Sequence, residues 1–437
     1  MPFAQYNAMN YTETLTFLYE QLPMYQRVGS VAFKKDLTNI RDLLAVLGSP
    51  ESKFASIHVG GTNGKGSVTH LLGAALQAGG YKTGLYTSPH FKDFRERIKV
   101  DGKYVSRKFV VDFVECIQPE LSRIRPSFFE ITVAMAFQYF AEQKVDIAVV
   151  EVGLGGRLDS TNVLAPELAV ITNISFDHQQ FLGDTLPEIA GEKAGIIKRG
   201  VPVVIGETQK ATANVFRTKA MELEAPLVFA DQLFQARKSK QDLTHSYYQI
   251  SRQNKPYINE LAINLHGGYQ QLNIQTALAA LEVWQMHEAD RFLPFDAIQE
   301  GWSNLRALTR FQGRWQLLSD QPRVLVDSAH NEGGLRAIME QLNTLPGELH
   351  IVMGVVNDKK LDQVLPLFPK GAKYYFAKAD IPRGLPAKDL QQTAALFELQ
   401  GRTYSSVRNA LRAAKRAASV EDTIFVGGSI FTVAEVL

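Results

Sequence analysis

The sequence predicts an α/β protein with a mostly parallel sheet domain that contains a phosphate-binding glycine loop, followed by a smaller Rossmann-like domain. Strand and helix patterns alternate along most of the chain, which is typical of parallel sheets covered by helices on both faces. A glycine-rich loop at residues 61–67 stands between a strand pattern and a helix pattern. The chain of 437 residues is also too long for one core. We place the boundary near residues 304–306, which gives domains of residues 1–305 and 306–437.

The first alternating series forms the larger domain. Apolar runs predict strands at residues 56–59, 82–87, 146–152, 168–174 and 202–205, and residues 67–78 carry a helix pattern. Residues 246–265 differ, because two β-rich runs flank a Gln-Asn-Lys-Pro turn signal. They predict an antiparallel hairpin at the side of the sheet. Helix patterns follow at residues 269–287 and 294–305.

A second alternating series follows the boundary. Strand patterns lie at residues 323–326, 350–353, 373–377 and 423–426, and helix patterns lie at residues 333–345, 388–399 and 407–418. About 130 residues of this kind are enough for a second, Rossmann-like domain.

Composition and charge indicate a soluble cytoplasmic protein. The hydrophobic content of 45% is typical of globular proteins, and a net charge of +2 is too small to favour nucleic acid as a partner. Cys116 is the only cysteine, so an intrachain disulfide is excluded and a reducing compartment is expected. It lies in an apolar helix pattern, where we expect a buried thiol. The start of the chain lacks the pattern of a signal peptide, and no apolar run predicts a membrane span.

The glycine loop reads Gly61-Thr-Asn-Gly-Lys-Gly-Ser67. Glycines let backbone N–H groups turn toward an anion, and the following helix adds partial positive charge. Lys65 supplies a full charge for the β- and γ-phosphates of a nucleotide, and Ser67 supplies a hydroxyl suited to Mg²⁺. The loop departs from the common P-loop pattern because Gly66 separates the lysine from the hydroxyl residue. The alternative interpretation is a tight turn without a ligand.

Further polar residues follow other strands of the same predicted sheet. Ser88 follows the second strand, Glu151 ends the third, and His178 comes shortly after the fourth. Parallel strands deliver such residues to one edge, where ligands bind. Hydroxyl and carboxylate oxygens suit Mg²⁺ beside nucleotide phosphates, whereas a histidine ligand leaves Mn²⁺ open. The alternatives are an ion-paired or helix-capping Glu151 and a hydrogen-bonded loop histidine.

Four segments together resemble a known family. They are the glycine loop, Thr87-Ser-Pro-His90, Glu151-Val-Gly-Leu-Gly-Gly-Arg-Leu-Asp-Ser-Thr-Asn162 and Gly191-Glu-Lys-Ala-Gly-Ile-Ile-Lys198. This combination resembles folylpolyglutamate synthase/dihydrofolate synthase, within the Mur ligase superfamily of ATP-dependent amide ligases. The resemblance runs from about Leu37 to the C-terminus, and it implies that the first domain is of the Mur ligase central-domain type.

The resemblance implies a set of residues for ATP and two Mg²⁺ ions. Asn63, Gly64, Lys65 and Gly66 would hold the phosphates, together with Arg314 from the second domain. Asn273 would contact the adenine and Asp327 the ribose side, and His330 is a candidate for the reaction centre. Ser88 would bind one Mg²⁺, and Glu151 with His178 the other. The family usually has glycine where Ser328 stands, and this departure keeps a small residue.

The resemblance also implies a pterin pocket. Its lining would come from two segments: Ser127, Phe128, Phe129, Glu130, Leu158, Asp159 and Ser160. Phe129 can stack on the ring, and Asp159 can accept hydrogen bonds from its N–H groups. Ser127 replaces a common threonine and keeps the hydroxyl. For Phe128 by itself a place in the helix core is the preferred interpretation.

Lys193 is implied to be a modified residue. In this family the lysine of the Glu-Lys-Ala-Gly segment is carbamylated by CO₂, and the resulting anion helps to hold the second Mg²⁺. A lysine near bound cations has a depressed pKa, so its neutral amine can attack CO₂. The alternative is an unmodified lysine paired with phosphate or with Glu192.

The implied reaction joins L-glutamate to dihydropteroate or a reduced folate. The substrate carboxylate attacks the γ-phosphate of ATP, and the amine of glutamate then displaces phosphate from the acyl phosphate. The family is generally monomeric. Two alternatives remain: a ligase acting on a UDP-muramyl cell-wall precursor, and a non-catalytic ATP-binding switch.

Overall fold

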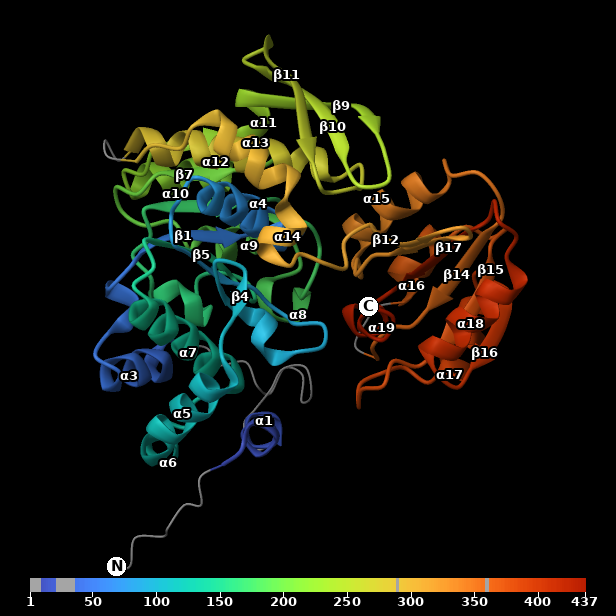
Figure 1. The fold of residues 1–437 in the computed structure, drawn as a ribbon, viewed down its shortest axis with the longest axis horizontal. Coiled ribbons are helices and arrows are strands. Elements are labelled where there is room, and N and C mark those ends of the chain that lie inside the picture. Colours follow the sequence, from blue (N-terminus) through green and yellow to red (C-terminus); the bar gives the residue numbers. More distant parts are fainter. Residues whose placement is uncertain (1–8, 21–35, 288–290, 358–360) are drawn as a thin grey trace, which may run out of the picture.

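The computed structural model describes residues 9–20, 36–287, 291–357 and 361–437. Within these residues the strands form three sheets (Figure 1). The largest sheet has the order β4-β3-β2-β5-β1-β6-β7-β8. Its strands are β1 Ala55–Gly60, β2 Thr83–Tyr86, β3 Ile98–Val100, β4 Lys103–Tyr104, β5 Ile147–Glu151, β6 Leu168–Ile171, β7 Val203–Ile205 and β8 Leu227–Phe229. Six of them run parallel, and the β3–β4 hairpin adds an antiparallel edge.

Strand β1 occupies the middle of this sheet and carries the glycine loop at its carboxyl end. Its residue Val59 lies opposite Glu151 on β5 and opposite Val170 on β6. The pairing brings the ends of three parallel strands together at the loop. All five strands predicted in this region are present, with bounds that differ by one to three residues, which confirms a mostly parallel sheet.

Helices cover both faces of the large sheet. One core lies under α4 Lys65–Ala78, α12 Gln270–His287 and α13 Phe295–Ser303. On the other face, α3 Thr38–Val46, α5 Arg107–Ile117 and α7 Phe128–Gln143 pack beside α9 Leu186–Ala194 and α10 Ala213–Glu222. The shorter or peripheral helices are α1 Tyr11–Glu20, α6 Leu121–Ile124, α8 Gln179–Leu182, α11 Ala230–Leu233 and α14 Leu305–Thr309.

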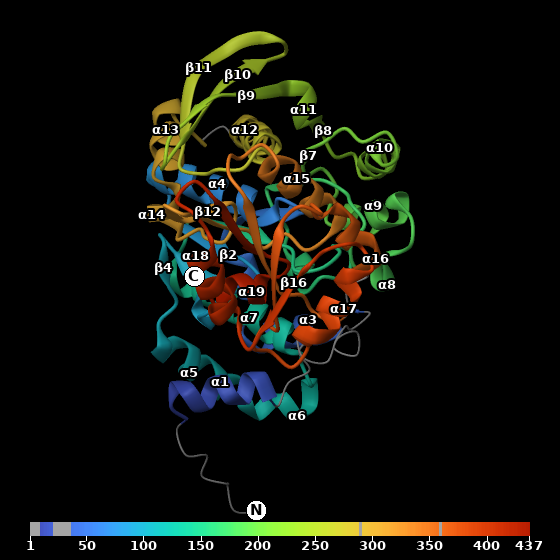
Figure 2. The same cartoon turned by 90° about the vertical axis from the view of Figure 1, so that its right-hand side faces the viewer.

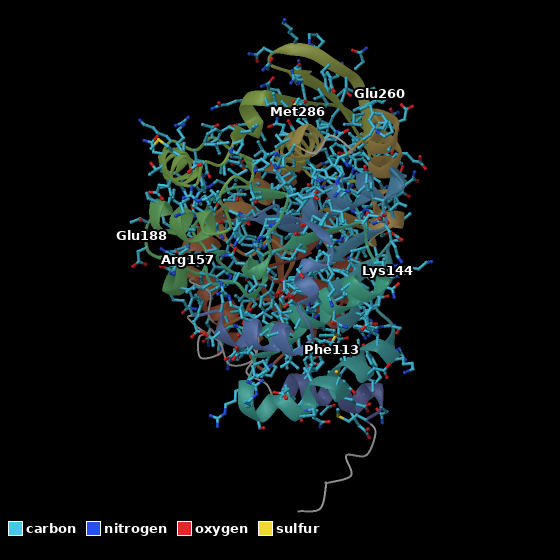
Figure 3. All side chains as sticks on the ribbon, turned by 90° about the vertical axis from the view of Figure 1, so that its left-hand side faces the viewer. Phe113, Lys144, Arg157, Glu188, Glu260 and Met286 are labelled. Atoms are coloured by element: carbon cyan, nitrogen blue, oxygen red, sulfur yellow. The ribbon has the colours of Figure 1, made fainter. Side chains whose placement is uncertain are left out.

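The predicted antiparallel hairpin is part of a three-stranded sheet. Strands β10 Ser246–Arg252 and β11 Lys255–Ile263 form the hairpin, and β9 Phe234–Gln241 pairs with the free side of β10. Apolar residues of this sheet pack on α12 and join the core of the larger domain. Figure 3 shows Glu260 of β11 and Met286 of α12 at one end of the molecule and Phe113 of α5 toward the other.

The C-terminal sheet has the order β12-β13-β17-β14-β15-β16 (Figure 2). Its strands are β12 Gln316–Asp320, β13 Arg323–Val326, β14 Leu349–Met353, β15 Lys373–Ala377, β16 Gly401–Tyr404 and β17 Thr423–Gly427. Helices α15 Glu332–Leu342, α16 Leu361–Val364 and α17 Ala387–Ala395 cover one face, and α18 Val407–Ala417 and α19 Ile430–Ala434 cover the other. Only β12 runs antiparallel, so the Rossmann-like prediction is confirmed.

One sequence-based expectation about a side chain is wrong. Cys116 is exposed rather than buried, because α5 turns Val110, Phe113, Val114 and Ile117 toward the core and Cys116 toward water. None of the helices in the described part of the chain has the length and apolar character needed to cross a bilayer.

Candidate active site

The glycine loop needs glycine at two of its positions. Gly61 has a φ of +129° and Gly64 a φ of +86°, a region that residues with a Cβ rarely adopt. A Cβ at Gly61 would lie 2.9 Å from the backbone nitrogen of Thr172, and a Cβ at Gly64 would collide with Oδ1 of Asn273. Asn273, predicted to contact adenine, therefore lies against the loop that is predicted to hold the phosphates.

Lys65 and Ser67 stand in the first turn of α4. Lys65 Nζ donates to the carbonyl oxygens of Gly61, at 3.1 Å, and Thr62, at 3.0 Å. Ser67 is buried. The strand–loop–helix pattern predicted this placement of both residues. A helix N-terminus and an ammonium group in one place favour the binding of an anion.

Asn173, which was not among the predicted site residues, supports the glycine loop. The Asn63 backbone N–H donates to Asn173 Oδ1 at 3.0 Å, and Asn173 Nδ2 donates to Glu207 at 2.9 Å. Asn173 comes two residues after the end of β6, at the same sheet edge as the glycine loop. That position was the available signal, because polar residues just beyond parallel strands meet at this edge.

Two predicted metal ligands meet beside the glycine loop. The Ser88 backbone N–H donates to Glu151 Oε2 at 3.1 Å, and a Cβ at Gly66 would lie 3.7 Å from Glu151 Oε1. Burial raises the pKa of Glu151, while the charges of Lys65 and Arg314 act in the opposite direction. A buried carboxylate with raised proton affinity gains from a cation, which favours the predicted metal-binding role.

Asp177 connects His178 with the C-terminal domain. His178 Nε2 lies 3.8 Å from Asp177 Oδ1, and His330 Nε2 lies 3.3 Å from Asp177 Oδ2. Asn331 Nδ2 also donates to Asp177 Oδ2, at 3.0 Å. The structure therefore brings the predicted metal ligand His178 and the reaction-centre candidate His330 together around one carboxylate.

Lys193 is buried on α9 and contacts the glycine loop. Its Nζ donates to the Gly61 carbonyl at 2.9 Å, so it shares this acceptor with Lys65. Burial and the nearby Lys65 charge lower the pKa of Lys193 to about 7, despite the opposing charges of Asp177 and Asp159. A large fraction of neutral amine near pH 7 is what carbamate formation requires.

The first predicted pterin segment begins helix α7. Ser127 and Glu130 form a capping box, in which the Ser127 N–H donates to Glu130 Oε2 at 2.6 Å and the Glu130 N–H donates to Ser127 Oγ at 3.3 Å. Phe128 is buried beside Arg97 and Phe94, in agreement with its preferred interpretation as core. Phe129 is only half-buried, so part of its ring remains accessible.

The second predicted pterin segment meets the first at Gly153. A Cβ there would collide with the Phe129 ring and lie 3.2 Å from Asp159 Oδ2. Asp159 is buried and caps the short 3-10 helix Ser160–Val163, and its Oδ2 accepts the Leu154 N–H at 2.8 Å. Leu158 and Ser160 flank it and are half-buried. The structure thus brings Phe129 and Asp159 together; contact with a pterin stays a prediction.

The C-terminal domain contributes Asp327, which binds a residue of the first domain. Tyr269 OH donates to Asp327 Oδ2 at 2.6 Å, and the backbone N–H of Trp315 donates to the same oxygen at 2.7 Å. Burial raises the pKa of Asp327, and nearby Arg314 opposes this shift. Tyr269 was missed by the sequence analysis because nothing local links it to a residue 58 positions away.

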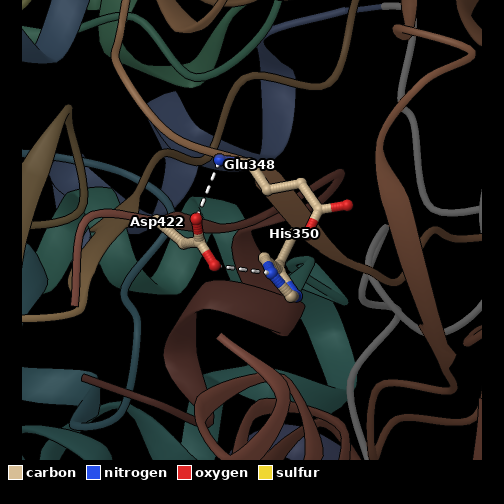
Figure 4. A group of neighbouring side chains, drawn as sticks. All are labelled: Glu348, His350 and Asp422. Carbon is tan, nitrogen blue, oxygen red and sulfur yellow. Dashed lines mark hydrogen bonds and ion pairs between the residues drawn. The ribbon is translucent and has the colours of Figure 1, made fainter. Parts of the chain in front are cut away.

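Another group of possible metal ligands lies away from this site (Figure 4). Among the described residues, Glu348, His350 and Asp422 hold ligand atoms within 4.8 Å of one another. Asp422 already accepts the backbone N–H groups of Glu348, at 2.9 Å, and Ser419, at 2.7 Å, and the Glu348 carboxylate pairs with Lys373 at 2.6 Å. Glu348 and Asp422 directly precede β14 and β17, and His350 is the second residue of β14. The group therefore lies at the amino ends of these two strands. Its oxygens hold loops together, and we assign it no metal.

Two family models, curated relatives and solved structures match this chain along most of its length. The model of the Mur ligase middle domain matches residues 59–281, and the model of the Mur ligase glutamate ligase domain matches residues 313–430. The dihydrofolate synthase/folylpolyglutamate synthase of Bacillus subtilis is 32% identical over 92% of this chain and 94% of its own. The folylpolyglutamate synthase of Lacticaseibacillus casei is 33% identical over 97% of each chain. A solved structure of Escherichia coli FolC with DHPP and ADP matches with a TM-score of 0.85 and 30% identity, over 98% of this chain and 97% of that one.

Proposed function

This chain belongs to the folylpolyglutamate synthase/dihydrofolate synthase family of ATP-dependent Mur ligases, and we propose that it joins L-glutamate to dihydropteroate and to reduced folates. The observation that carries the proposal is the meeting of the glycine loop, the Ser88–Glu151 pair and the C-terminal domain at one sheet edge. We further propose that the protein acts as a monomer in the cytoplasm.

ATP is the first substrate in this proposal. Asn63, Gly64, Lys65 and Gly66, with Ser67 behind them, hold its phosphates at the N-terminus of α4, where Lys65 can exchange its carbonyl partners for phosphate oxygens. Asn273 lies against Gly64 and serves the adenine side. Arg314 and Asp327 contribute from the C-terminal domain, so the nucleotide binds between the domains.

The residues present are suitable for two Mg²⁺ ions. Ser88, Glu151 and His178 are the ligand candidates, and carbamylated Lys193 would add a second carboxylate. Oxygen donors beside nucleotide phosphates match the preference of Mg²⁺. Bound Mg²⁺ would neutralise phosphate charge, and the buried Glu151 carboxylate is held for this purpose by the Ser88 backbone N–H.

The chain's own residues then orient the reactants. The carboxylate of dihydropteroate or folate attacks the γ-phosphorus, the bond to the β-phosphate oxygen breaks, and ADP leaves. The amine of L-glutamate attacks the resulting acyl phosphate, releases phosphate and loses a proton. Lys65 offsets negative charge during the first step, and contacts from both domains exclude water from the acyl phosphate. His330 lies beside Asp177 near the domain junction and is a candidate to contact the reacting groups.

The test is ADP formation from ATP with each acceptor, with and without L-glutamate. We expect turnover with dihydropteroate and with tetrahydrofolate only when glutamate is present, and an amide product by mass spectrometry. Turnover with a UDP-muramyl acceptor instead would establish the cell-wall alternative. ATP hydrolysis that responds to neither acceptor class nor glutamate would contradict ligase activity and favour a nucleotide switch.

A further inference from the structure

We propose that His58 and Thr161 are positioning residues for the pteridine substrate, because a buried chain of hydrogen bonds runs from His58 through Thr161 to Asp159. The inference rests on the proposed function, since it gives these residues a task only if Asp159 serves a pteridine. It concerns residues that lie behind the predicted pocket rather than in its lining.

The three side chains form a continuous chain in the core of the larger domain. His58 and Thr161 are both 0% exposed, and His58 Nε2 lies 2.8 Å from Thr161 Oγ1. The Thr161 hydroxyl and the Thr161 backbone N–H, the latter at 3.0 Å, both donate to Asp159 Oδ1. The Thr161 hydroxyl has one proton and donates it to the Asp159 carboxylate, so it can only accept from His58. We therefore assign His58 Nε2 as the N–H donor to Thr161.

The state of His58 agrees with this assignment. Burial lowers the pKa of His58 to about 3, with a smaller contribution from the Lys198 charge, so the ring is neutral. Its Nδ1 is buried and receives no hydrogen bond from the part of the chain that the structure describes. A neutral ring with its one proton on Nε2 leaves an acceptor unsatisfied, whereas the other tautomer would bury an unpaired N–H group and also set Nε2 against an oxygen whose proton already serves Asp159.

The hydrogen bonds from His58 through Thr161 to Asp159 determine which carboxylate oxygen of Asp159 faces Phe129, the predicted ring-stacking residue. Oδ1 of Asp159 is held by Thr161, and Oδ2 is the oxygen that lies 3.2 Å from the Cβ position of Gly153, where the Phe129 ring also packs. Rotation of the Asp159 carboxylate would break the bonds from Thr161 at one end and from Leu154 at the other. The chain therefore sets the distance between the aromatic face and the acceptor oxygen, which a flat ring with N–H groups requires.

Strand β1 connects these hydrogen-bonded residues with the predicted phosphate site. His58 stands three positions before Gly61, whose carbonyl accepts hydrogen bonds from both Lys65 and Lys193. One strand in the middle of the sheet thus fixes the pteridine end and the phosphate end of the site. A small displacement between reacting groups costs much of the rate advantage of positioning, so a rigid common support has a physical purpose.

The test compares substitutions that break the chain with others that keep it. Thr161→Val and His58→Leu remove the polar links with little change in volume, whereas Thr161→Ser and His58→Gln keep a hydroxyl and a side-chain N–H donor. We expect the first pair to raise KM for the pteridine about tenfold, as for one lost hydrogen bond, and to leave KM for ATP nearly unchanged. Thr161→Ser and His58→Gln should restore most of the affinity. In an Asp159→Ala background, Thr161→Val should add no further increase.

The outcomes separate this inference from the proposed function. Thermal unfolding and ADP binding report whether each variant is folded, and His58→Leu breaks the chain from its other end if Thr161→Val fails to fold. A pteridine KM unchanged in the first pair, or equal increases in KM for ATP and pteridine, would overturn the positioning role alone. A wild-type protein that uses neither dihydropteroate nor tetrahydrofolate would contradict the proposed function itself.

Discussion

Asn331 of the C-terminal domain donates its side-chain amide to Asn63 Oδ1 in the glycine loop, at 3.0 Å. The same nitrogen lies 3.0 Å from Asp177 Oδ2, and Asn331 Oδ1 accepts the Gly334 N–H as the N-cap of α15. One side chain therefore caps the N-terminus of a helix of the second domain and also contacts the glycine loop of the first. This contact joins the two domains at the glycine loop.

We predict that Asn331→Ser weakens catalysis without unfolding the protein. Serine is a good N-cap, so α15 keeps its first hydrogen bond, but the shorter side chain cannot reach Asn63. The expected loss in kcat/KM for ATP is about tenfold, from one or two polar contacts between the domains. Steady-state kinetics and a melting curve check it. Asn409→Ser, at an exposed position on α18, is the matched control. Unchanged kinetics would show that the contact has no part in catalysis.

Lys65→Ala should remove ligase activity while the fold stays intact. The ammonium group donates to two loop carbonyls, so it contributes charge at the predicted phosphate site rather than core packing. A loss of about 100-fold or more in kcat is expected from removal of a charge that stabilises the transition state. The measurement is ADP formation at saturating ATP, and Lys108→Ala on the exposed side of α5 is the matched control. Near-normal turnover would contradict the role of the glycine loop.

Lys193 should carry a carbamate. Its pKa of about 7 makes the amine mostly protonated below that pH and mostly neutral above it, so recovery of activity with bicarbonate after acid treatment should speed up as pH rises through 7. Lys193→Ala should lose most activity, and acetate or formate should restore part of it by replacing the missing anion.

Intact mass and electron density under CO₂-retaining conditions give the direct check for the carbamate. A well-ordered free ammonium in an ATP·Mg²⁺ complex at pH 8 would refute it, provided that CO₂ is present. Lys198→Ala is a control on a nearby lysine, whose Nζ donates to the Asn162 carbonyl rather than to the glycine loop.

Asp159→Ala should reduce dihydrofolate synthesis much more than glutamate addition to tetrahydrofolate. The predicted pocket pairs Asp159 with Phe129, and a carboxylate that accepts pterin N–H groups discriminates strongly against rings that lack them. A protein limited to chain extension need not hold dihydropteroate in this pocket. Rates with both acceptors, measured for the variant and for Asp112→Ala at an exposed position of α5, check the ratio. Asp159 also accepts hydrogen bonds from Leu154 and Thr161. Equal losses with both acceptors would therefore assign it to holding its own loop.

Tyr269→Phe should weaken ATP binding. Tyr269 OH donates to the buried Asp327, so its loss leaves a carboxylate short of one partner at the predicted ribose position. We expect KM for ATP to rise about fivefold to tenfold while KM for glutamate stays constant. Tyr247→Phe, which removes an exposed hydroxyl bonded to Asp242, is the matched control. A change in the glutamate KM alone would place Tyr269 in a different part of the site.

Local sequence patterns predicted the parts of the site that lie on single elements. The strand–glycine–helix order located Lys65 and Ser67, and the positions of Ser88 and Glu151 at strand ends predicted that they meet, which the hydrogen bond between them bears out. These inferences hold because the carboxyl ends of parallel strands share one edge. The Ser127–Glu130 capping box was also readable from the sequence, although the resemblance assigned both residues to a pocket instead.

Tertiary structure decided what depends on partners distant in the chain. Strand β9 was not predicted because its outer half is polar and its pairing with β10 is set by packing on α12. Cys116 proved exposed because an apolar pattern defines a helix but fixes its buried face only through neighbours. The sequence by itself determined the fold class, the glycine loop and the family. The contacts of Asn331 with Asn63, of Tyr269 with Asp327 and of His58 with Thr161 required the fold, because each joins residues more than 50 positions apart whose meeting depends on long-range packing.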